Sequence, residues 1–228
     1  MLTTLENIQI LYEDNHIIMV NKRVGDIVQG DKTGDTPLNE IVKQYIQIKY
    51  QKPGDVFLGV VHRIDRPTSG IILFARTSKA LERLNEMLRD KKIIKTYWAI
   101  IKNTPPKDAD TLIHFLKKNE KNNKSTTFSS ESEGSKKAIL HYKLLKILDN
   151  YSLLEINLET GRHHQIRAQL AAIGCPIKGD LKYGFPRSNN DGGIHLHARK
   201  VDFTHPVSNQ NISITAPLPE DAIWNLCE

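Results

Sequence analysis

Cysteine is scarce in this chain, and its scarcity excludes one class of fold. The 228 residues include two cysteines, Cys175 and Cys227. Two thiols cannot form the disulfide framework that holds small secreted domains together, so a hydrophobic core must stabilise the fold. We therefore predict a cytoplasmic protein and assign both cysteines to packing rather than to chemistry.

Long apolar runs are also missing. No stretch approaches the roughly 18 consecutive apolar residues that a transmembrane helix requires. The first residues, Met1 to Asn7, do not combine a cationic segment with an apolar run, which is the pattern of a secretory signal. We expect no membrane span and no signal peptide.

The composition that remains is that of an ordinary soluble globular protein with a basic balance. Hydrophobic residues make up 39% and charged residues 25%, and the formal net charge is +6. A chain of this length can form one large domain or two small ones, and it can bury a sizeable core. The positive charge suits a polyanionic partner such as RNA or DNA, although many basic proteins bind neither.

Apolar alternation predicts many strands and few helices. The predicted strands are residues 8–12, 16–21, 56–61, 71–75, 93–101, 138–147, 152–158, 194–203 and 212–216. One helix is predicted to begin at Thr36-Pro37, with Thr36 as its N-cap and Pro37 as its first helical residue. Two more are predicted over 77–91 and 164–173. Because strands and helices do not alternate strictly, the pattern favours an α+β fold with a central mixed or antiparallel sheet and flanking helices.

One tract is too polar to predict as a packed element. Residues 119–134 are rich in Ser, Thr, Asn, Lys and Glu, and we predict a flexible loop or hairpin tip there. An alternative is that the tract becomes ordered on RNA, with its lysines and the two lysines before it, Lys117 and Lys118, meeting phosphates.

Candidate functional residues occur in three short sequence segments, here called islands. The first is Arg63-Ile64-Asp65-Arg66, which runs from an apolar strand into a Pro/Gly turn. Neighbouring cations favour the ionised form of a carboxylate, so we expect Asp65 to be charged. The second island is Lys95–Trp98 and the third is Gly161–Arg167. Read alone, Asp65 could equally be one partner of a surface ion pair.

Taken in order, these segments resemble the RluA-type family of RNA pseudouridine synthases. The resemblance covers about Ile8 to Pro217, and an ordered set of motifs is far more specific than any one of them. The matching segments are Tyr12-Glu13-Asp14, Lys22-x-x-Gly25, His62-Arg63-Ile64-Asp65-Arg66-x-Thr68-Ser69-Gly70, Lys95-x-Tyr97-x-Ala99, Gly161-Arg162-x-His164-Gln165-Ile166-Arg167, Gly174-x-Pro176-Ile177-x-Gly179-Asp180 and Leu196-His197-Ala198. Where the family usually has proline after the first lysine, this chain has Arg23.

The resemblance implies a reaction and a set of catalytic residues. The family isomerises uridine in RNA to pseudouridine without a cofactor or a metal. Its essential aspartate falls on Asp65, its base-stacking tyrosine on Tyr97, its aspartate-pairing arginine on Arg167 and its aliphatic base contact on Ile166. The uridine must be flipped out of folded RNA to reach such a site. Asp65 could attack the ribose C1′, add to C6 of the base or abstract the 2′ proton, and the sequence does not choose among these roles.

Three further arginines are candidate substrate contacts. Arg63 and Arg66 flank the aspartate and could bind phosphates or fill the gap left by the flipped base. Arg162 is a candidate contact to the RNA backbone. For Tyr97 and Arg167 the alternatives are a core aromatic and a solvated cation.

The resemblance also predicts organisation and partners. We expect one catalytic domain over 1–228 with an active cleft across the sheet, no preceding S4-type RNA-binding module, and a monomer. The expected partner is structured RNA, ribosomal or transfer. Alternative functions are a non-catalytic RNA-binding protein that keeps the fold, and a hydrolase that uses Asp65, for which no second carboxylate stands at a recognisable spacing.

The histidines invite a metal interpretation. Adjacent His163-His164 cannot easily chelate one ion, and no CxxC or HExxH spacing occurs. We therefore predict no metal, and expect hydrogen-bonding roles for the histidines, most of all for His197 and His205.

Overall fold

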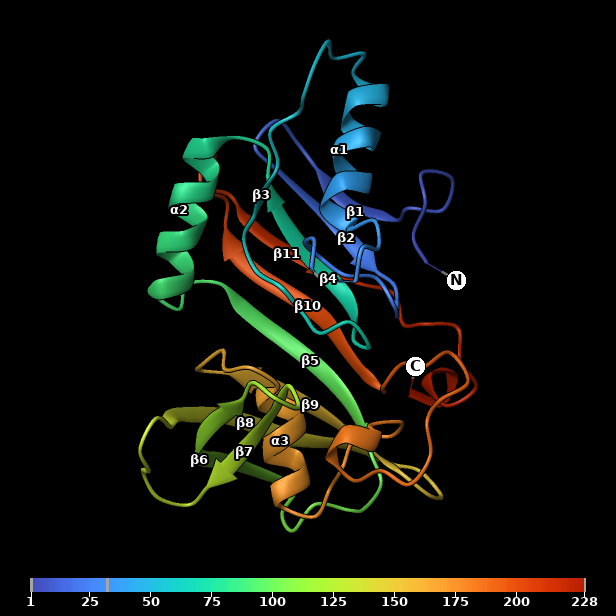
Figure 1. Ribbon diagram of the computed structural model, residues 1–228, viewed down its shortest axis with the longest axis vertical. Helices are drawn as coiled ribbons and strands as arrows, with labels where there is room; N and C mark the ends of the chain where they lie inside the picture. Colours follow the sequence, from blue (N-terminus) through green and yellow to red (C-terminus); the bar gives the residue numbers. More distant parts are fainter. Residues whose placement is uncertain (1, 32, 228) are drawn as a thin grey trace. The chain divides into compact units, whose positions relative to one another are not determined.

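The computed structural model describes residues 2–31 and 33–227. The chain divides into two compact units (Figure 1). Unit 1 comprises Met1–Ile94 and Ala198–Pro219, and unit 2 comprises Lys95–His197 and Glu220–Glu228. The chain therefore leaves unit 1, builds most of unit 2 and then returns. That the whole chain acts as one catalytic domain stays a prediction.

Unit 1 is built on strands of a mixed sheet (Figure 1). Its strands are β1 (Ile10–Glu13), β2 (Ile17–Lys22), β3 (Gly59–Val60), β4 (Ser69–Ala75), β10 (Leu196–Thr204, whose first two residues belong to unit 2) and β11 (Asn211–Thr215). The order is β1-β2-β4-β10, while β11 pairs with β10 and β3 pairs with β4. Strand β4 is buried along its whole length, which explains its unbroken apolar sequence.

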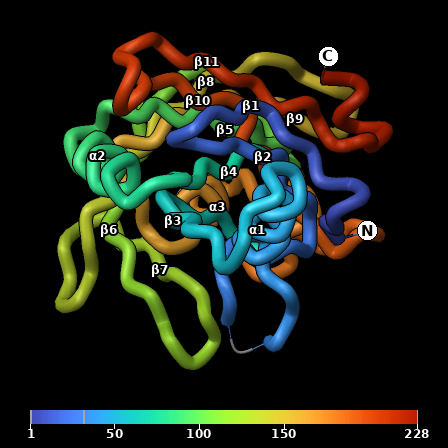
Figure 2. Tube along the Cα trace, turned by 90° about the horizontal axis from the view of Figure 1, so that it is seen from above, coloured from blue at the N-terminus to red at the C-terminus, as the bar shows by residue number. Residues whose placement is uncertain are grey.

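The two helices of unit 1 pack against opposite faces of this sheet. Helix α1 (Leu38–Lys49) contributes to one hydrophobic cluster with Ile18 and Ile72, and helix α2 (Ser78–Arg89) contributes to another with Met19 and Leu73. Neighbouring residues on a strand point to opposite faces, so these pairs supply both layers of the core. Seen from above, the two helices are well apart and nearly end-on (Figure 2).

The helix starts test the capping predictions. Helix α2 begins after Thr77, whose hydroxyl accepts a hydrogen bond from the Ala80 backbone N–H at 3.2 Å and so caps the helix. Helix α1 has Pro37 itself at the N-cap, without a side-chain cap, so the assignment of Thr36 to that role is wrong. The extended backbone of Pro37 moves the first helical residue one position along the chain.

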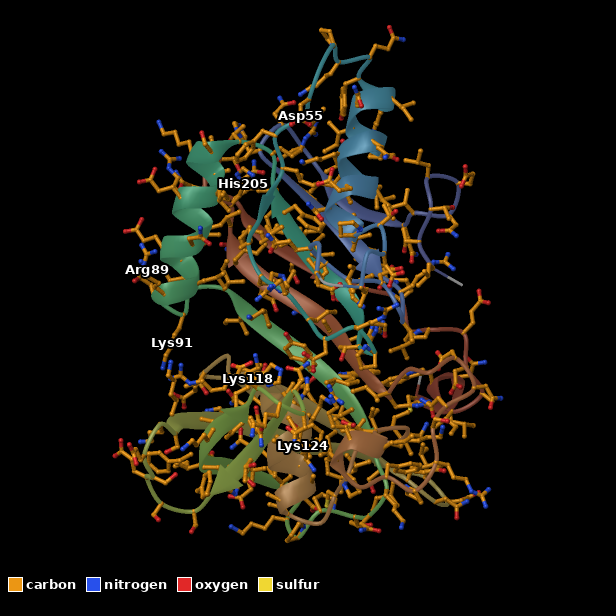
Figure 3. The ribbon with its side chains drawn as sticks, viewed as in Figure 1. Asp55, Arg89, Lys91, Lys118, Lys124 and His205 are labelled. Atoms are coloured by element: carbon orange, nitrogen blue, oxygen red, sulfur yellow. The ribbon has the colours of Figure 1, made fainter. Side chains whose placement is uncertain are left out.

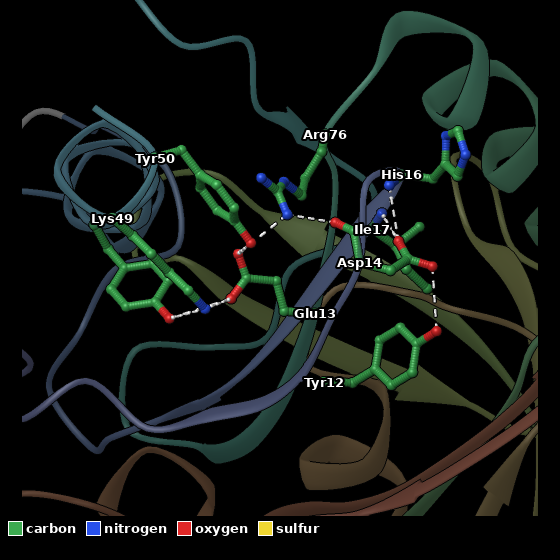
Figure 4. Close-up of polar contacts among 9 residues, drawn as sticks. Tyr12, Glu13, Asp14, His16, Ile17, Lys49, Tyr50 and Arg76 are labelled. Carbon is green, nitrogen blue, oxygen red and sulfur yellow. Dashed lines mark hydrogen bonds and ion pairs between the residues drawn. The ribbon is translucent and has the colours of Figure 1, made fainter. Parts of the chain in front are cut away.

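A buried carboxylate joins α1 to the first strands (Figure 4). Glu13, at the end of β1, accepts hydrogen bonds from Lys49 at 2.6 Å and Tyr50 at 2.9 Å, and it forms an ion pair with Arg76 at 3.0 Å. Burial alone would raise the pKa of Glu13, but the hydrogen bonds from Lys49, Tyr50 and Tyr45 together outweigh it and lower that pKa. The network fixes the end of α1 against the β1–β2 turn.

In unit 2 the strands pair antiparallel with one another, in the order β5-β9-β8-β6-β7. Its strands are β5 (Ile94–Ile101, whose first residue belongs to unit 1), β6 (Ala109–Asn119), β7 (Lys124–Phe128), β8 (Lys136–Ile147) and β9 (Ser152–Leu158). Helix α3 (Gln165–Ala172) contacts β6 and β7, and two short 3-10 helices follow, η1 (Leu181–Tyr183) and η2 (Trp224–Cys227). The α+β class is confirmed.

Three segments differ from the sequence-based expectation. No strand was predicted where β6 forms. The polar tract 119–134 contains strand β7, which pairs with β6 from Phe115–Phe128 to Asn119–Lys124. Its backbone pairs with β6, but its sequence has no apolar alternation from which a strand could be predicted. The predicted strand over 56–61 is reduced to β3, although Val56 and Leu58 are buried as the apolar run implies. No helix of the described residues is long and apolar enough to cross a membrane.

Candidate active site

Asp65 lies in a tight turn of unit 1, in the connection from β3 to β4. It is half-buried, and its backbone carbonyl accepts a hydrogen bond from the Thr68 N–H at 3.0 Å. Pro67 stands inside this turn, where its fixed φ angle restricts the backbone. The turn therefore holds the aspartate at a defined place just before a fully buried strand.

Lys22 fastens this turn from the end of β2. Its side chain is 1% exposed, and its Nζ donates to the carbonyls of Arg23 at 2.9 Å, Arg66 at 3.1 Å and Thr68 at 2.7 Å. Burial is the main cause that lowers the pKa of Lys22 to about 7, and the nearby carboxylates of Asp26 and Asp65 oppose it. A lysine that the motif comparison left without a role thus connects β2 to the turn that carries Asp65.

Backbone contacts from the same segment complete the attachment. The Gly25 N–H donates to the Arg66 carbonyl at 3.0 Å, so that carbonyl receives two hydrogen bonds. Arg23, which replaces the family's usual proline, uses its N–H to donate to Asp26 at 3.1 Å. Proline has no N–H, so the family's usual residue could not form this bond.

Gly70 fixes the exit of the turn. Its φ angle is +113°, and a Cβ atom there would lie 2.4 Å from the Ala198 carbonyl oxygen. Only glycine permits this conformation and this approach of β4 to β10. Backbone geometry therefore requires glycine at the end of the His62–Gly70 motif.

The two arginines beside Asp65 have different surroundings. Arg66 forms an ion pair with Asp35 at 2.7 Å, and both side chains are more than 40% exposed. Arg63 is exposed and borders a cavity of about 510 Å³ that is also lined by Gln29 and Asn39. Both guanidinium groups are therefore accessible from solvent, as a substrate contact requires.

The second group of predicted residues belongs to unit 2. Tyr97 lies in β5 opposite Ile156 of β9 and is 6% exposed. On the same face of β5, burial lowers the pKa of Lys95. Ile166 is 5% exposed on α3. The structure thus describes Tyr97, Ile166 and Arg167 in one unit and Arg63, Asp65 and Arg66 in the other.

Arg167 has a carboxylate partner that the sequence analysis did not predict. Its Nε donates to Asp180 at 2.7 Å and its second terminal nitrogen donates to the other carboxylate oxygen at 2.9 Å. Both side chains are buried, with 5% and 1% exposed. This bidentate ion pair fixes the orientation of the guanidinium plane. The Gly179-Asp180 motif contained the signal, but it had no role assigned; the pairing of Arg167 with Asp65 stays a prediction.

The loop before α3 is held by Gln165 rather than by a conventional cap. Its side-chain oxygen accepts from the Arg162 N–H at 3.0 Å and from the Thr160 hydroxyl at 2.8 Å. Arg162, the predicted RNA contact, is exposed, and its Nε donates to the Lys137 carbonyl at 3.0 Å. One edge of that guanidinium group is therefore hydrogen-bonded to β8.

Two histidines join a buried network in unit 2. The Tyr183 hydroxyl accepts a hydrogen bond from the Ser125 N–H at 2.8 Å and lies 3.0 Å from His164 Nδ1. The rings of His163 and His164 stack at 3.8 Å, and the Ser125 hydroxyl donates to the His163 carbonyl at 2.6 Å. This network connects β7, the loop before α3 and η1, as expected for structural histidines.

Other titratable groups also have structural surroundings. His205 accepts from the Val207 and Ser208 N–H groups, at 3.2 and 2.9 Å. Both cysteines are buried, and burial raises the pKa of each thiol. Within residues 2–31 and 33–227, no cluster of three His, Cys, Asp or Glu residues could hold a metal ion.

Comparison with known proteins identifies the family. The family described as RNA pseudouridylate synthase matches residues 16–172. The chain is 34% identical to the "Uncharacterized RNA pseudouridine synthase YlyB" of Bacillus subtilis (94% of this chain, 70% of the relative) and 33% identical to the "Ribosomal large subunit pseudouridine synthase C" of Buchnera aphidicola (95% and 69%). The chain belongs to the RNA pseudouridine synthase family, and the enzyme is an isomerase that converts uridine in RNA to pseudouridine.

Solved structures agree on the fold. The chain superimposes on "Human RNA Pseudouridylate Synthase Domain Containing 4" with a TM-score of 0.79 at 22% identity, over 96% of this chain and 92% of that one. A second human structure, "Human RNA Pseudouridylate Synthase Domain Containing 1", gives 0.76 at 20% identity, over 99% of this chain and 89% of that one. At these identities the similarity establishes the architecture.

Proposed function

We propose that Asp65 performs the isomerisation and that the substrate is ribosomal RNA of the large subunit. The reaction breaks the bond between N1 and C1′ and forms a bond between C5 and C1′. A proton leaves C5 and N1 gains one, so the formula is unchanged and no co-reactant is consumed. Each of the three roles open to Asp65 requires a carboxylate at a fixed position.

The observation that supports Asp65 most strongly is the attachment of its turn. A wholly buried lysine donates to the Arg66 and Thr68 carbonyls, and Gly25 donates to the first of these again. Reacting groups must be held within fractions of an ångström, and rigid surroundings supply that precision. A turn that carried only a surface ion pair would not need a buried lysine to hold its carbonyls.

Tyr97 and Arg167 are proposed to complete the site, on the basis of the family resemblance. Tyr97 would receive the flipped uracil on its ring, an interaction worth about 1–3 kcal/mol for a stacked base. Arg167, whose plane is fixed by Asp180, would orient the Asp65 carboxylate. Ile166 would contact the base, while Arg63, Arg66 and Arg162 would bind the phosphates around the extruded nucleotide.

The choice of RNA rests on relatives. One is named "Ribosomal large subunit pseudouridine synthase C", and another, from Zymomonas mobilis and 31% identical, is named "Ribosomal large subunit pseudouridine synthase D". These names favour ribosomal over transfer RNA, while the net charge of +6 suits either RNA. A cytoplasmic monomer is the corresponding form of the protein.

Pseudouridine mapping of total RNA tests this function. A strain that lacks the gene should lose pseudouridine at one or more positions of large-subunit ribosomal RNA, and the wild-type gene should restore them. A gene carrying Asp65→Asn should not restore them. Loss confined to transfer RNA would contradict the proposed substrate, and an unchanged map would contradict the proposed function in that cell.

A further inference from the structure

Unit 2 contains a cavity of about 450 Å³ that the proposed chemistry does not use. It opens where β5 ends, beside the β8–β9 turn and the segment after η1. Its walls carry three cations, Lys102, Lys178 and Arg187, and two aromatic rings, Tyr151 and Phe185. The other lining residues are neutral, so this concave surface has no carboxylate of its own.

The cavity is built from fixed parts. The Lys178 N–H donates to the Ile100 carbonyl at 2.9 Å, and its Nζ donates to Asn189 at 2.7 Å. Asn189 in turn donates to the Gly193 carbonyl at 3.0 Å. Asn189 also packs closely on Gly179, whose φ angle is +87°. A Cβ atom at position 179 would lie 2.6 Å from the side-chain amide nitrogen of Asn189. The position of the Lys178 ammonium group is therefore defined before any ligand binds.

The arrangement of the side chains suits one chemical class. Lys178 Nζ lies 5.9 Å from the centre of the Tyr151 ring, so an aromatic face and a cation stand side by side. Phe185 is 8% exposed and forms an apolar wall, whereas Lys102 and Arg187 are exposed at the opening. A nucleotide needs an aromatic surface for its base and cations for its phosphate, and a cavity of several hundred Å³ accommodates one.

Two acidic residues near the cavity are engaged elsewhere. Asp221 accepts from His195 at 2.9 Å and from the Ile223 N–H at 2.9 Å. Asp191 accepts from the Gly193 N–H at 2.9 Å. Neither of these carboxylates forms an ion pair with a cation that lines the cavity, and Asp149, beside the lining residue Asn150, is exposed to solvent.

We propose that this cavity binds a nucleotide of the substrate RNA other than the uridine that reacts. Lys102, Lys178 and Arg187 hold its phosphate, and Tyr151 stacks on its base. The site anchors RNA at a second point and so contributes to the choice of substrate. This inference rests on the proposed function, because it assumes an RNA substrate.

The test separates binding from chemistry. The substrate is total RNA from cells that lack the gene, labelled with tritium at C5 of uridine, and the readout is tritium release as a function of RNA concentration and salt. The variant Lys102→Gln/Arg187→Gln should raise KM about tenfold and leave kcat unchanged. The slope of log(kcat/KM) against log salt concentration should also become less negative. The change should be roughly 0.7–0.9 for each phosphate that the variant no longer neutralises. Tyr151→Leu should raise KM, whereas Tyr151→Phe should not.

The control has the same change in charge. Lys79→Gln/Lys143→Gln removes two exposed cations elsewhere in the two units, and it should give the KM and the salt dependence of the wild type. If the two double variants behave alike, the cavity is not an RNA site and only the net charge matters. If the wild type releases no tritium, the proposed function fails instead, so the two failures are distinguishable.

A free nucleotide has the same chemistry as one in RNA, and a separate measurement distinguishes them. Isothermal titration of the wild type with uridine 5′-monophosphate should show binding far weaker than that of RNA. Tight binding of the mononucleotide, together with a KM for RNA that Lys102→Gln/Arg187→Gln leaves unchanged, would overturn the proposal in favour of a small-molecule site.

Discussion

Lys22 is an unusual residue, because a lysine ammonium group is seldom removed from water. Its burial lowers its pKa to about 7, far below the ordinary value of 10.5, while three backbone carbonyls accept hydrogen bonds from it. Desolvation of a cation destabilises the folded state unless its contacts compensate. We infer that the lysine is retained for what it holds, which is the turn that carries Asp65.

The depressed pKa of Lys22 predicts a pH dependence of stability. Between pH 7 and 10.5 the unfolded chain holds a proton on Lys22 that the folded chain has released, so stability rises with pH in this window. Relative to Lys22→Met, the wild type should gain up to about 1.4 kcal/mol per pH unit. Urea unfolding at a series of pH values measures this difference.

Lys79→Met is the control, because Lys79 is exposed on α2. Its difference from the wild type should not vary with pH over the same window. A Lys22→Met curve parallel to that of the wild type would mean that Lys22 titrates alike in the folded and unfolded states.

The Arg167–Asp180 pair makes a second prediction at the residue scale. Asp180→Asn leaves a buried guanidinium group without its counter-charge, which should reduce the free energy of unfolding by about 3–5 kcal/mol. The double variant Arg167→Met/Asp180→Leu removes both charges and should recover much of that stability. Urea unfolding of both variants measures the difference. Equal destabilisation of the two proteins would show that the charge pairing is not what the fold requires.

Among the secondary-structure elements, the β6–β7 hairpin departs most from its sequence. Its tip is polar and contains several lysines, among them Lys118 and Lys124 (Figure 3), yet β7 forms a regular ladder with β6. The buried side of β7 is Ser125, whose N–H and hydroxyl bind Tyr183 and His163. Polar contacts therefore position β7, and Leu116 of β6 adds an apolar contact to the hairpin.

Tyr183→Phe tests that account. The phenylalanine keeps the ring but leaves the Ser125 N–H without its acceptor at a buried position, which should destabilise the local structure by about 1–3 kcal/mol. Hydrogen exchange of the β7 amides should become faster, while exchange of the β4 amides in unit 1 should not change. Unaltered protection of β7 would show that ladder pairing alone holds the hairpin.

The elements that could be predicted from sequence are those with apolar periodicity. Strand β9 was predicted at its observed bounds, Ser152–Leu158, because its alternation is strict. Strands β6 and β7 were missed because neither has strict apolar alternation, and Thr36 was wrongly taken as a cap because a proline can occupy that position itself. Propensity describes local preference, and tertiary contacts decide the rest.

The candidate site shows the same division. The motifs located Asp65, Tyr97 and Arg167, because these residue types recur in a recognisable order. They did not reveal that Asp180 pairs with Arg167 or that Lys22 supports the turn of Asp65, since both contacts join residues whose geometry depends on the fold. The supporting residues were present in the motifs, but their roles needed coordinates.

At the scale of the whole molecule, the proposed catalytic residues are divided between the two units. Unit 1 supplies Asp65 on its fastened turn, and unit 2 supplies Tyr97 and Arg167. The family match, residues 16–172, covers all three. The central claim is that the carboxylate of Asp65 is required for chemistry and that the fold does not depend on it.

The most direct test is tritium release from RNA labelled at C5 of uridine, with wild type, Asp65→Asn and Asp55→Asn compared at saturating RNA. Asp55 is an exposed carboxylate of the same unit and serves as the matched control. The account predicts release by the wild type and by Asp55→Asn, and none by Asp65→Asn, although that variant should unfold at the wild-type urea concentration. Release by Asp65→Asn at the wild-type rate would contradict the assignment of Asp65 as the catalytic residue.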